Sequence, residues 1–206
     1  MGKTRYYVAA SIDGFIADRD GGLRWLLQFG FEEFQAEYDA FLAEVGVVVM
    51  GSATYEFLLG EGGPWAYPEQ VSWVLTSRPL PLPELPPVAL QSGERQSGEL
   101  QHGESQVGEL QAGALRFARG DVSALHAQWL ETAAGRDVWI VGGGHVAAQV
   151  ADAGLIDEIV LTTMPVVLGA GTPLLPIAAT SGVLAAAGTH VHPSGAITTT
   201  YAMPRR

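Results

Sequence analysis

Two hydrophobic patterns alternate along the chain. Between residues 31 and 45, apolar side chains recur at the spacing of an amphipathic helix, and acidic residues such as Glu32 and Asp39 fall opposite them. The run VVVM at 47–50 has no polar alternation, which is typical of a strand buried on both faces of a parallel sheet. Because Gly46 separates the two patterns, we predict that the helix ends there and that a buried strand follows.

Predicted strands and helices follow one another over most of the chain. We predict strands at 5–12, 47–50, 73–76, 137–141 and 156–167, and helices at 31–45, 54–59, 122–133 and 145–153. Residues 15–18 and the Gly21-Gly22 pair are predicted as loop. The segments that flank Pro193-Ser194-Gly195 predict an antiparallel C-terminal hairpin. This order indicates the α/β class, as a three-layer αβα domain with a mixed sheet.

A low-complexity repeat interrupts the pattern. Glutamine recurs every five residues from Gln91 to Gln111, each time followed two residues later by glycine, in the form Q-x-G-E-x. A period of five fits neither a helix nor a strand, and the composition offers no continuous apolar face. We therefore expect residues 1–206 to form one domain, with a surface insertion at about 91–114.

Composition and charge narrow the classes of function. The 206 residues carry a formal net charge of −11 and no cysteine, which excludes disulfides, zinc–thiolate sites and a cysteine nucleophile. An acidic surface repels phosphate backbones, so no nucleic-acid partner is expected. The first residues lack an apolar stretch of signal-peptide length, and no run reaches the roughly 20 residues that a membrane helix needs. We expect a cytoplasmic protein without a membrane partner.

The strongest chemical signal is the string DVWIVGGGHVAAQV at 137–150, which is a predicted strand, a glycine turn and a helix. Glycines let backbone N–H groups approach a phosphate, and the positive end of the helix dipole favours the anion. Two alternatives stay open. The glycines could serve only close packing of the helix on the sheet, and the spacing of Gly142, Gly144 and Ala147 also fits a loose Rossmann fingerprint.

Two further junctions point to the same chemistry. Gly51 and Thr54 open a helix directly after the buried strand, although an ordinary Ser or Thr N-cap is the better explanation of this junction taken alone. Ser77 and Arg78 follow the strand at 73–76 and offer a hydroxyl and a guanidinium to a phosphomonoester. Ligands of open α/β sheets bind outside the carboxyl ends of the strands, where all three junctions should meet. Together they predict a nicotinamide dinucleotide, with NADPH favoured over NADH because Arg78 suits a 2′-phosphate.

At this point the chain resembles the dihydrofolate-reductase-like superfamily, and more closely the C-terminal reductase domain of the bifunctional riboflavin-biosynthesis deaminase–reductase and its stand-alone relatives. The matching strings, in family order, are AASIDGFIAD (9–18), MGSATYE (50–56), VLTSRPL (74–80), WIVGGGHVA (139–147) and LIDEIVLTTMPVVLGAGTPLLP (155–176). The resemblance implies a mostly parallel eight-stranded sheet with NADPH across the strand ends, and commonly a homodimer.

The resemblance also assigns cofactor positions. It implies that Ala10 and Ile16 lie near the nicotinamide. The implied phosphate and adenosine contacts are Gly51, Ser52, Ala53, Thr54, Thr76, Ser77, Arg78, Gly142, Gly143, Gly144, His145 and Val146. Two of them depart from the family, because Ser52 and His145 stand where basic residues are usual. Each lost charge-assisted hydrogen bond is worth roughly 1.5–3 kcal/mol, so weaker binding of a 2′-phosphate is expected.

The substrate side offers three candidates. Asp13 borders the expected cleft and could orient a substrate or supply a proton, or simply form the turn before Gly14. Trp25 could wall the pocket or pack in the core. Folate reductases use a helix carboxylate whose position falls here on Gln35, and the nearest acid at the buried face is Glu37.

His190 and His192 form an H-x-H pair, but no third ligand is apparent in the sequence, so no metal site is predicted.

The leading hypothesis is an NADPH-dependent reductase of a small polar heterocyclic or imine-like substrate, of the 5-amino-6-(5-phosphoribosylamino)uracil reductase type. The sequence leaves two rivals. One is a non-catalytic dimeric nucleotide-binding module of the same fold, and the other is a dihydrofolate reductase-like activity. The S-x-D-G string at 11–14 favours the riboflavin-type relatives over the folate enzymes.

Overall fold

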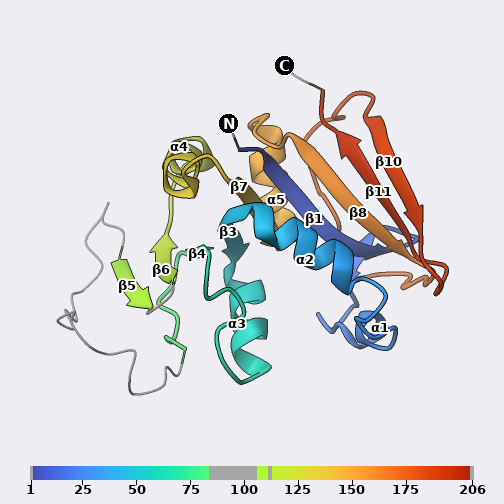
Figure 1. The fold of residues 1–206 in the computed structure, drawn as a ribbon, viewed down its shortest axis with the longest axis horizontal. Coiled ribbons are helices and arrows are strands. Elements are labelled where there is room, and N and C mark those ends of the chain that lie inside the picture. Colours follow the sequence, from blue (N-terminus) through green and yellow to red (C-terminus); the bar gives the residue numbers. More distant parts are fainter. Residues whose placement is uncertain (1, 84–105, 111–112, 205–206) are drawn as a thin grey trace.

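The computed structural model describes residues 2–83, 106–110 and 113–204. One sheet of nine strands forms the middle of the molecule, in the order β10-β11-β8-β1-β7-β3-β4-β6-β5. In Figure 1, β5 and β10 lie at its two ends. The strands are β1 (Thr4–Ser11), β3 (Val45–Gly51), β4 (Val71–Leu75), β5 (Gln106–Leu110), β6 (Gly113–Ala118), β7 (Asp137–Gly142), β8 (Glu158–Met164), β10 (Ala185–Val191) and β11 (Ile197–Ala202).

The direction of the strands matches the expected mixed sheet. All neighbours from β8 to β6 pair in parallel, whereas β11 pairs antiparallel with both β8 and β10. Without β5, the sheet has the eight strands that the resemblance implied. The predicted α/β class, the mostly parallel sheet and the antiparallel C-terminal strands are confirmed.

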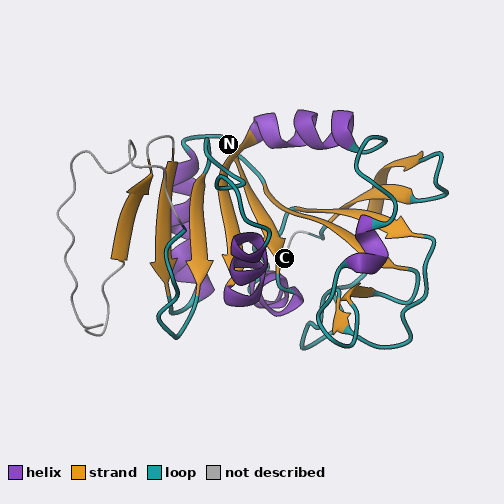
Figure 2. Ribbon diagram, turned by 90° about the horizontal axis from the view of Figure 1, so that it is seen from below, coloured by secondary structure: helices purple, strands orange, loops and turns teal. Residues whose placement is uncertain are grey.

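Helices cover both faces of the sheet, as Figures 1 and 2 show. Val47 and Val49 of β3 face one core with α4 (Val122–Ala133) and α5 (Gly144–Asp152). Val48 and Met50 face the opposite core with α2 (Gln35–Glu44) and α3 (Ser52–Gly60). Burial on both faces explains why VVVM carries no polar alternation. In the described part of the chain, no helix is long and apolar enough to cross a bilayer.

The local differences from the sequence expectation lie at element ends. Helix α2 ends at Glu44, and Gly46 belongs to β3, where a Cβ would lie 2.9 Å from the carbonyl oxygen of Ala133. Gly46 is therefore needed for close packing against α4 and not as a helix terminator. Phe31 precedes α2 and is 47% exposed, so the helix does not begin at this residue, although Phe31 fits the apolar spacing of the predicted helix.

Two short elements were not predicted: a helix where no element was expected, and a strand at 15–17 in place of predicted loop. Residues Arg24–Leu27 form the helix α1, and Phe15–Ala17 form the strand β2, which pairs with β9 (Thr172–Pro173) in a second small sheet. The repeat also differs in part from the expected insertion. Its residues Gln106–Leu110 form β5, which pairs antiparallel with β6. Residues 91–105 and 111–112 of the repeat lie outside the described residues.

Candidate functional site

The predicted cofactor segments meet at one edge of the sheet, where the parallel strands end. In the pairing register, Met50 of β3 lies beside Gly142 of β7, and Gly51 lies beside Leu75 of β4. The turns that follow these three strands therefore start side by side. Sequence order alone does not bring them together, because about 90 residues separate the turn after β3 from the turn after β7.

Helices α3 and α5 begin at this edge and share one feature. Each has a glycine at its N-cap, Gly51 for α3 and Gly143 for α5, and neither end has a side-chain cap. Helix α4 differs, since Asp121 accepts a hydrogen bond from the Ser123 backbone N–H. Uncapped first-turn N–H groups and the positive helix dipole favour an anion at a helix start. The strand-end edge thus holds two adjacent helix starts of this kind.

The two glycine turns touch each other. A Cβ on Gly142 would lie 3.1 Å from the hydroxyl oxygen of Thr54, and a Cβ on Gly51 would lie 3.2 Å from Cγ2 of Val146. Gly143 has a φ of +77°, a conformation that side-chain-bearing residues seldom adopt. These glycines bring the starts of α3 and α5 within contact distance.

The packing explanation of the triple glycine holds for one of its members. A Cβ on Gly144 would lie 2.1 Å from the carbonyl oxygen of Pro173 and 2.9 Å from that of Leu174. Gly144 is buried and opens α5 against the 173–174 backbone. This position is therefore fixed by the fold, whatever the turn binds.

Side chains around the turns differ in exposure. Ala53 and His145 are exposed, Ser52 and Thr54 are half-buried, and Val146 is buried. Accessible side chains thus surround the helix starts, and among them His145 is the only ionisable group.

Arg78 lies close to the same edge but has a partner. Its guanidinium donates to a carboxylate oxygen of Glu56 on α3 at 2.5 Å, with the two side chains 55% and 41% exposed. The hydrogen bond from Arg78 lowers the pKa of Glu56, and the same bond raises the pKa of Arg78. Thr76 fixes the turn, since its hydroxyl oxygen accepts from the Arg78 backbone N–H and donates to the Arg78 carbonyl. Ser77 beside them is exposed.

Near the end of β1, Ala10 is buried and Ile16 of β2 is half-buried. Asp13 is exposed, yet its carboxylate accepts hydrogen bonds from the Ser11 hydroxyl at 2.7 Å and from the backbone N–H groups of Leu168 and Gly169 at 3.0 and 2.7 Å. The Ser11 bond and then the backbone bonds lower the pKa of Asp13. A carboxyl held in its ionised form is poorly suited to supply a proton at neutral pH, so the geometry favours positioning over acid catalysis.

Trp25 of α1 is 8% exposed and packs with Met164 and Ala196 in a small third core. Between the two interpretations of Trp25, the structure supports core packing over a pocket wall. Met164 is the last residue of β8, so Trp25 packs against the end of that strand and its ring is largely shielded from solvent.

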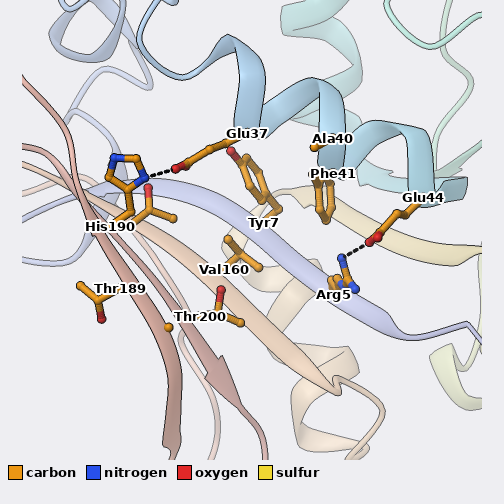
Figure 3. A pocket seen from close by; sticks show the side chains of 12 residues that line it. Arg5, Tyr7, Glu37, Ala40, Phe41, Glu44, Val160, Thr189, His190 and Thr200 are labelled. Atoms are coloured by element: carbon orange, nitrogen blue, oxygen red, sulfur yellow. Dashed lines mark hydrogen bonds and ion pairs between the residues drawn. The ribbon is translucent and has the colours of Figure 1, made fainter.

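Glu37 lies elsewhere, on the face of the sheet beneath α2. A cavity of about 370 Å³ opens there between α2 and strands β10 and β11, and Glu37 and His190 line it together with Arg5 and Tyr7. Figure 3 shows Glu37 reaching His190 across this cavity. Arg5 is held by carboxylate oxygens of Glu44, Asp137 and Glu158 at 2.7, 3.1 and 3.1 Å.

The structure brings a third potential ligand group, the carboxylate of Glu37, to the H-x-H pair, which the sequence did not reveal. Oxygens of Glu37 lie against Nδ1 of His190 and 3.6 Å from Nε2 of His192. Sequence reasoning missed the cluster because Glu37 and His190 are about 150 residues apart. It also missed Glu56, although an acidic residue one turn into the helix after a glycine junction is a visible signal.

Comparison with known proteins agrees with the fold. Residues 115–187 match the family model described as the RibD C-terminal domain. An uncharacterised Bacillus subtilis protein, YwjB, is 29% identical over 84% of this chain and 82% of its own length. A solved structure from Shewanella sp. PV-4, described as that of a riboflavin biosynthesis protein, matches with a TM-score of 0.74 at 24% identity. The match covers 98% of this chain and 99% of the Shewanella chain. Dihydrofolate reductase from Enterococcus faecalis, solved with NADP(H), has a TM-score of 0.58 at 18% identity over 98% and 96%.

The predicted resemblance to riboflavin-type reductase domains is thereby confirmed, and the fold is dihydrofolate-reductase-like.

Proposed function

We propose that this protein is an NADPH-dependent reductase of a small polar heterocyclic or imine-like substrate. The observation that carries the proposal is the contact between two uncapped helix starts, Gly51–Thr54 of α3 and Gly142–Val146 of α5, at the carboxyl ends of β3 and β7. The fold match to a dihydrofolate reductase solved with NADP(H) supports the same cofactor.

The residues present fit a dinucleotide. Backbone N–H groups at the starts of α3 and α5 would hold the pyrophosphate, and the Thr54 hydroxyl lies between the two turns. Ala10 and Ile16 would border the nicotinamide, which supplies a hydride when it is bound. The chain would contribute orientation and the exclusion of water, and Asp13, through Leu168 and Gly169, would hold the loop beside that position.

The 2′-phosphate end is the least prepared part of the proposed site. Arg78, the residue assigned to it, already pairs with Glu56, and Ser52 and His145 add no permanent positive charge. NADPH would have to replace the Glu56 carboxylate as the partner of Arg78. We therefore expect a modest preference for NADPH over NADH, set by competition between Glu56 and the phosphate for one guanidinium.

For the substrate, a phosphoribosyl group is a weaker match than an unphosphorylated heterocycle. The chain carries 11 Lys and Arg residues against 22 Asp and Glu residues, and Arg78, the arginine at the strand-end edge, is already assigned to the cofactor. A ribose phosphate on the substrate would therefore approach a protein of net negative charge. The 5-amino-6-(5-phosphoribosylamino)uracil type of substrate ranks below its dephosphorylated analogues.

The sheet edge at β10 supports a homodimer as part of the proposal. Every residue from Ala185 to Val191 is exposed, and Val183 and Val191 are 93% and 64% exposed. An exposed edge strand with apolar side chains is a usual place for a second chain to pair. Light scattering coupled to size exclusion should give a mass of two chains, and a mass of one chain would contradict this part.

Turnover tests the proposal against its rivals. Purified protein is incubated with NADPH and a panel of pterins, dihydropterins, aminopyrimidines with and without ribose phosphate, and cyclic imines, and the loss of absorbance at 340 nm is followed. Oxidation with a pyrimidine or imine supports the proposal, and oxidation with dihydrofolate alone would favour the folate-type activity. Saturable NADPH binding without turnover on any member would favour the non-catalytic module.

A further inference from the structure

From the group Glu37, His190 and His192 we infer a binding site for a divalent transition-metal ion of the Zn²⁺ type, on the face of the sheet beneath α2. The site is separate from the strand-end edge where the cofactor is proposed to bind, and it does not depend on that proposal. Three strands, β1, β8 and β11, lie between β7 with its glycine turn and β10.

The three side chains come together from two elements. His190 lies in β10 and His192 directly follows the end of that strand, and their rings stack with centroids 4.5 Å apart and an angle of 2° between planes. Glu37 projects toward them from α2. One ligand atom from each of the three residues lies within 4.8 Å of the other two.

The spacing between Glu37 and His192 suits a small metal ion, and the Glu37 and His190 side chains, which are in direct contact, would move apart to admit it. Zinc binds imidazole nitrogen at about 2.0–2.1 Å and carboxylate oxygen at about 2.0–2.2 Å, so the ligand atoms around a tetrahedral ion lie roughly 3.3 Å apart. The 3.6 Å between Glu37 and Nε2 of His192 is close to that value. Two imidazoles and one carboxylate also form a set that zinc uses where one coordination position stays open.

The surroundings hold the buried ligand in place. The His192 ring is buried, packs against the Phe34 ring at 4.6 Å between centroids, and has its Nε2 2.7 Å from the Thr198 hydroxyl oxygen. Thr198 has a second partner in Thr162, with the two hydroxyl oxygens 2.9 Å apart. Thr198 would therefore keep Thr162 as a hydrogen-bond partner if Nε2 of His192 bound a metal ion.

The other side of the cluster is open. Glu37 and His190 line the cavity of about 370 Å³, and their side chains are 32% and 57% exposed. An ion held by the three residues would have its fourth position directed to this cavity, where water or an oxygen-bearing ligand fits. This arrangement distinguishes the site from a closed structural zinc site, which has four protein ligands.

Metal titration of tag-free, chelator-treated protein tests the inference, with Zn²⁺ followed by calorimetry and Co²⁺ by its visible absorption. We expect one equivalent per chain and intense Co²⁺ bands of the kind that tetrahedral coordination gives. His190→Ala, which alters an exposed side chain, should weaken binding at least 100-fold, and Glu37→Gln at least 10-fold. His145→Ala removes a histidine outside the cluster and should bind metal like the parent chain.

Circular dichroism of each variant shows whether the fold is retained, and His190→Ala carries the test because that side chain is exposed. Absence of saturable binding by the parent protein would overturn the inference. Equal loss in His190→Ala and His145→Ala would overturn it as well, since binding would then not be located at the cluster. In either case the three residues would form an ion-paired cluster without a metal.

Discussion

Gly144 is the position of the glycine turn with the least room for a side chain. The 2.1 Å between its virtual Cβ and the Pro173 carbonyl oxygen is too short for any residue but glycine. This contact packs the start of α5 directly against Pro173 of β9. At the residue scale, the turn thus combines a packing requirement at Gly144 with a positive φ at Gly143.

We predict that Gly144→Ala destabilises the protein by about 1–3 kcal/mol or more, because backbone atoms and not a flexible side chain must move. Chemical denaturation with an unchanged m-value measures the difference. Gly60→Ala is the matched control. No atom lies within 4 Å of a Cβ at Gly60, the residue is in α3, and alanine there should be neutral or stabilise by up to about 1 kcal/mol. Equal stability of the two variants would contradict the contact.

His126 gives the stability a defined dependence on pH. Its Nε2 lies 2.7 Å from the hydroxyl oxygen of the buried Thr4, and burial lowers the pKa of His126, partly offset by Asp157. A group whose pKa is lower in the folded state binds more protons when unfolded. Its contribution is therefore present above the ordinary histidine pKa of about 6.5 and is lost as pH falls through that value toward the folded-state pKa.

Accordingly, the melting temperature should fall between pH 7.5 and pH 5.5, and His126→Gln should show a shallower fall because it removes the titrating group. Thermal scans of both proteins across this range measure the slopes. Identical slopes would show that His126 is not a source of the acid sensitivity.

At the scale of elements, helix α3 presents both favourable and unfavourable groups to a dinucleotide. Its uncapped start favours a phosphate, while Glu56, one turn further, holds Arg78. The balance between NADPH and NADH therefore depends on one ion pair between α3 and the turn after β4. Since both side chains are largely exposed, the pair itself contributes little to folding stability.

Removing one partner should shift the balance in opposite directions. Arg78→Ala should weaken the binding of NADPH by about 10–150-fold, which corresponds to the loss of one charge-assisted hydrogen bond. The affinity for NADH should stay nearly unchanged. Glu56→Gln should strengthen the binding of NADPH by up to about fivefold, because the Arg78 guanidinium would no longer be paired with a carboxylate. Dissociation constants for both nucleotides measure the effect, with Glu61→Gln, at the far end of α3, as the control of equal charge. If Arg78→Ala weakened the binding of NADPH and NADH equally, Arg78 would not be the residue that binds the 2′-phosphate.

Most elements of the fold follow from local pattern. Helix α4 has the predicted bounds, Val122–Ala133, because its apolar period and its Asp121 cap agree. Helix α2 begins later than predicted because Phe31 belongs to the preceding turn, where tertiary contacts and not periodicity decide. The strand β5 was missed because pairing with β6 supplies hydrogen bonds that repeat composition does not reveal.

The candidate site divides in the same way. Glycine junctions are local, so the sequence locates the starts of α3 and α5, and parallel strand ends imply that they meet. The contacts of Arg78 with Glu56 and of His190 with Glu37 are set by how helices lie against the sheet. No spacing in the sequence encodes them, and they required the structure.

At the level of the whole molecule, the two faces of the nine-stranded sheet differ in what they carry. The core under α4 and α5 holds the glycine turn against β7, and the face under α2 carries the cavity with Glu37 and His190. The proposed cofactor lies at the strand-end edge between these layers. This division explains why the chain could bind a nucleotide and a metal ion at different places on one domain.

The starts of α3 and α5 are proposed to hold a nicotinamide dinucleotide. Calorimetric titration with NADPH at moderate ionic strength tests this proposal most directly, with Thr54→Val, a variant that keeps the shape of the side chain beside Gly142, measured in parallel. We expect saturable binding of one NADPH per chain below millimolar concentration, and about 2–10-fold weaker binding by the variant because one hydrogen bond is lost. No saturable binding of NADPH or NADH at millimolar concentration by a correctly folded protein would contradict it.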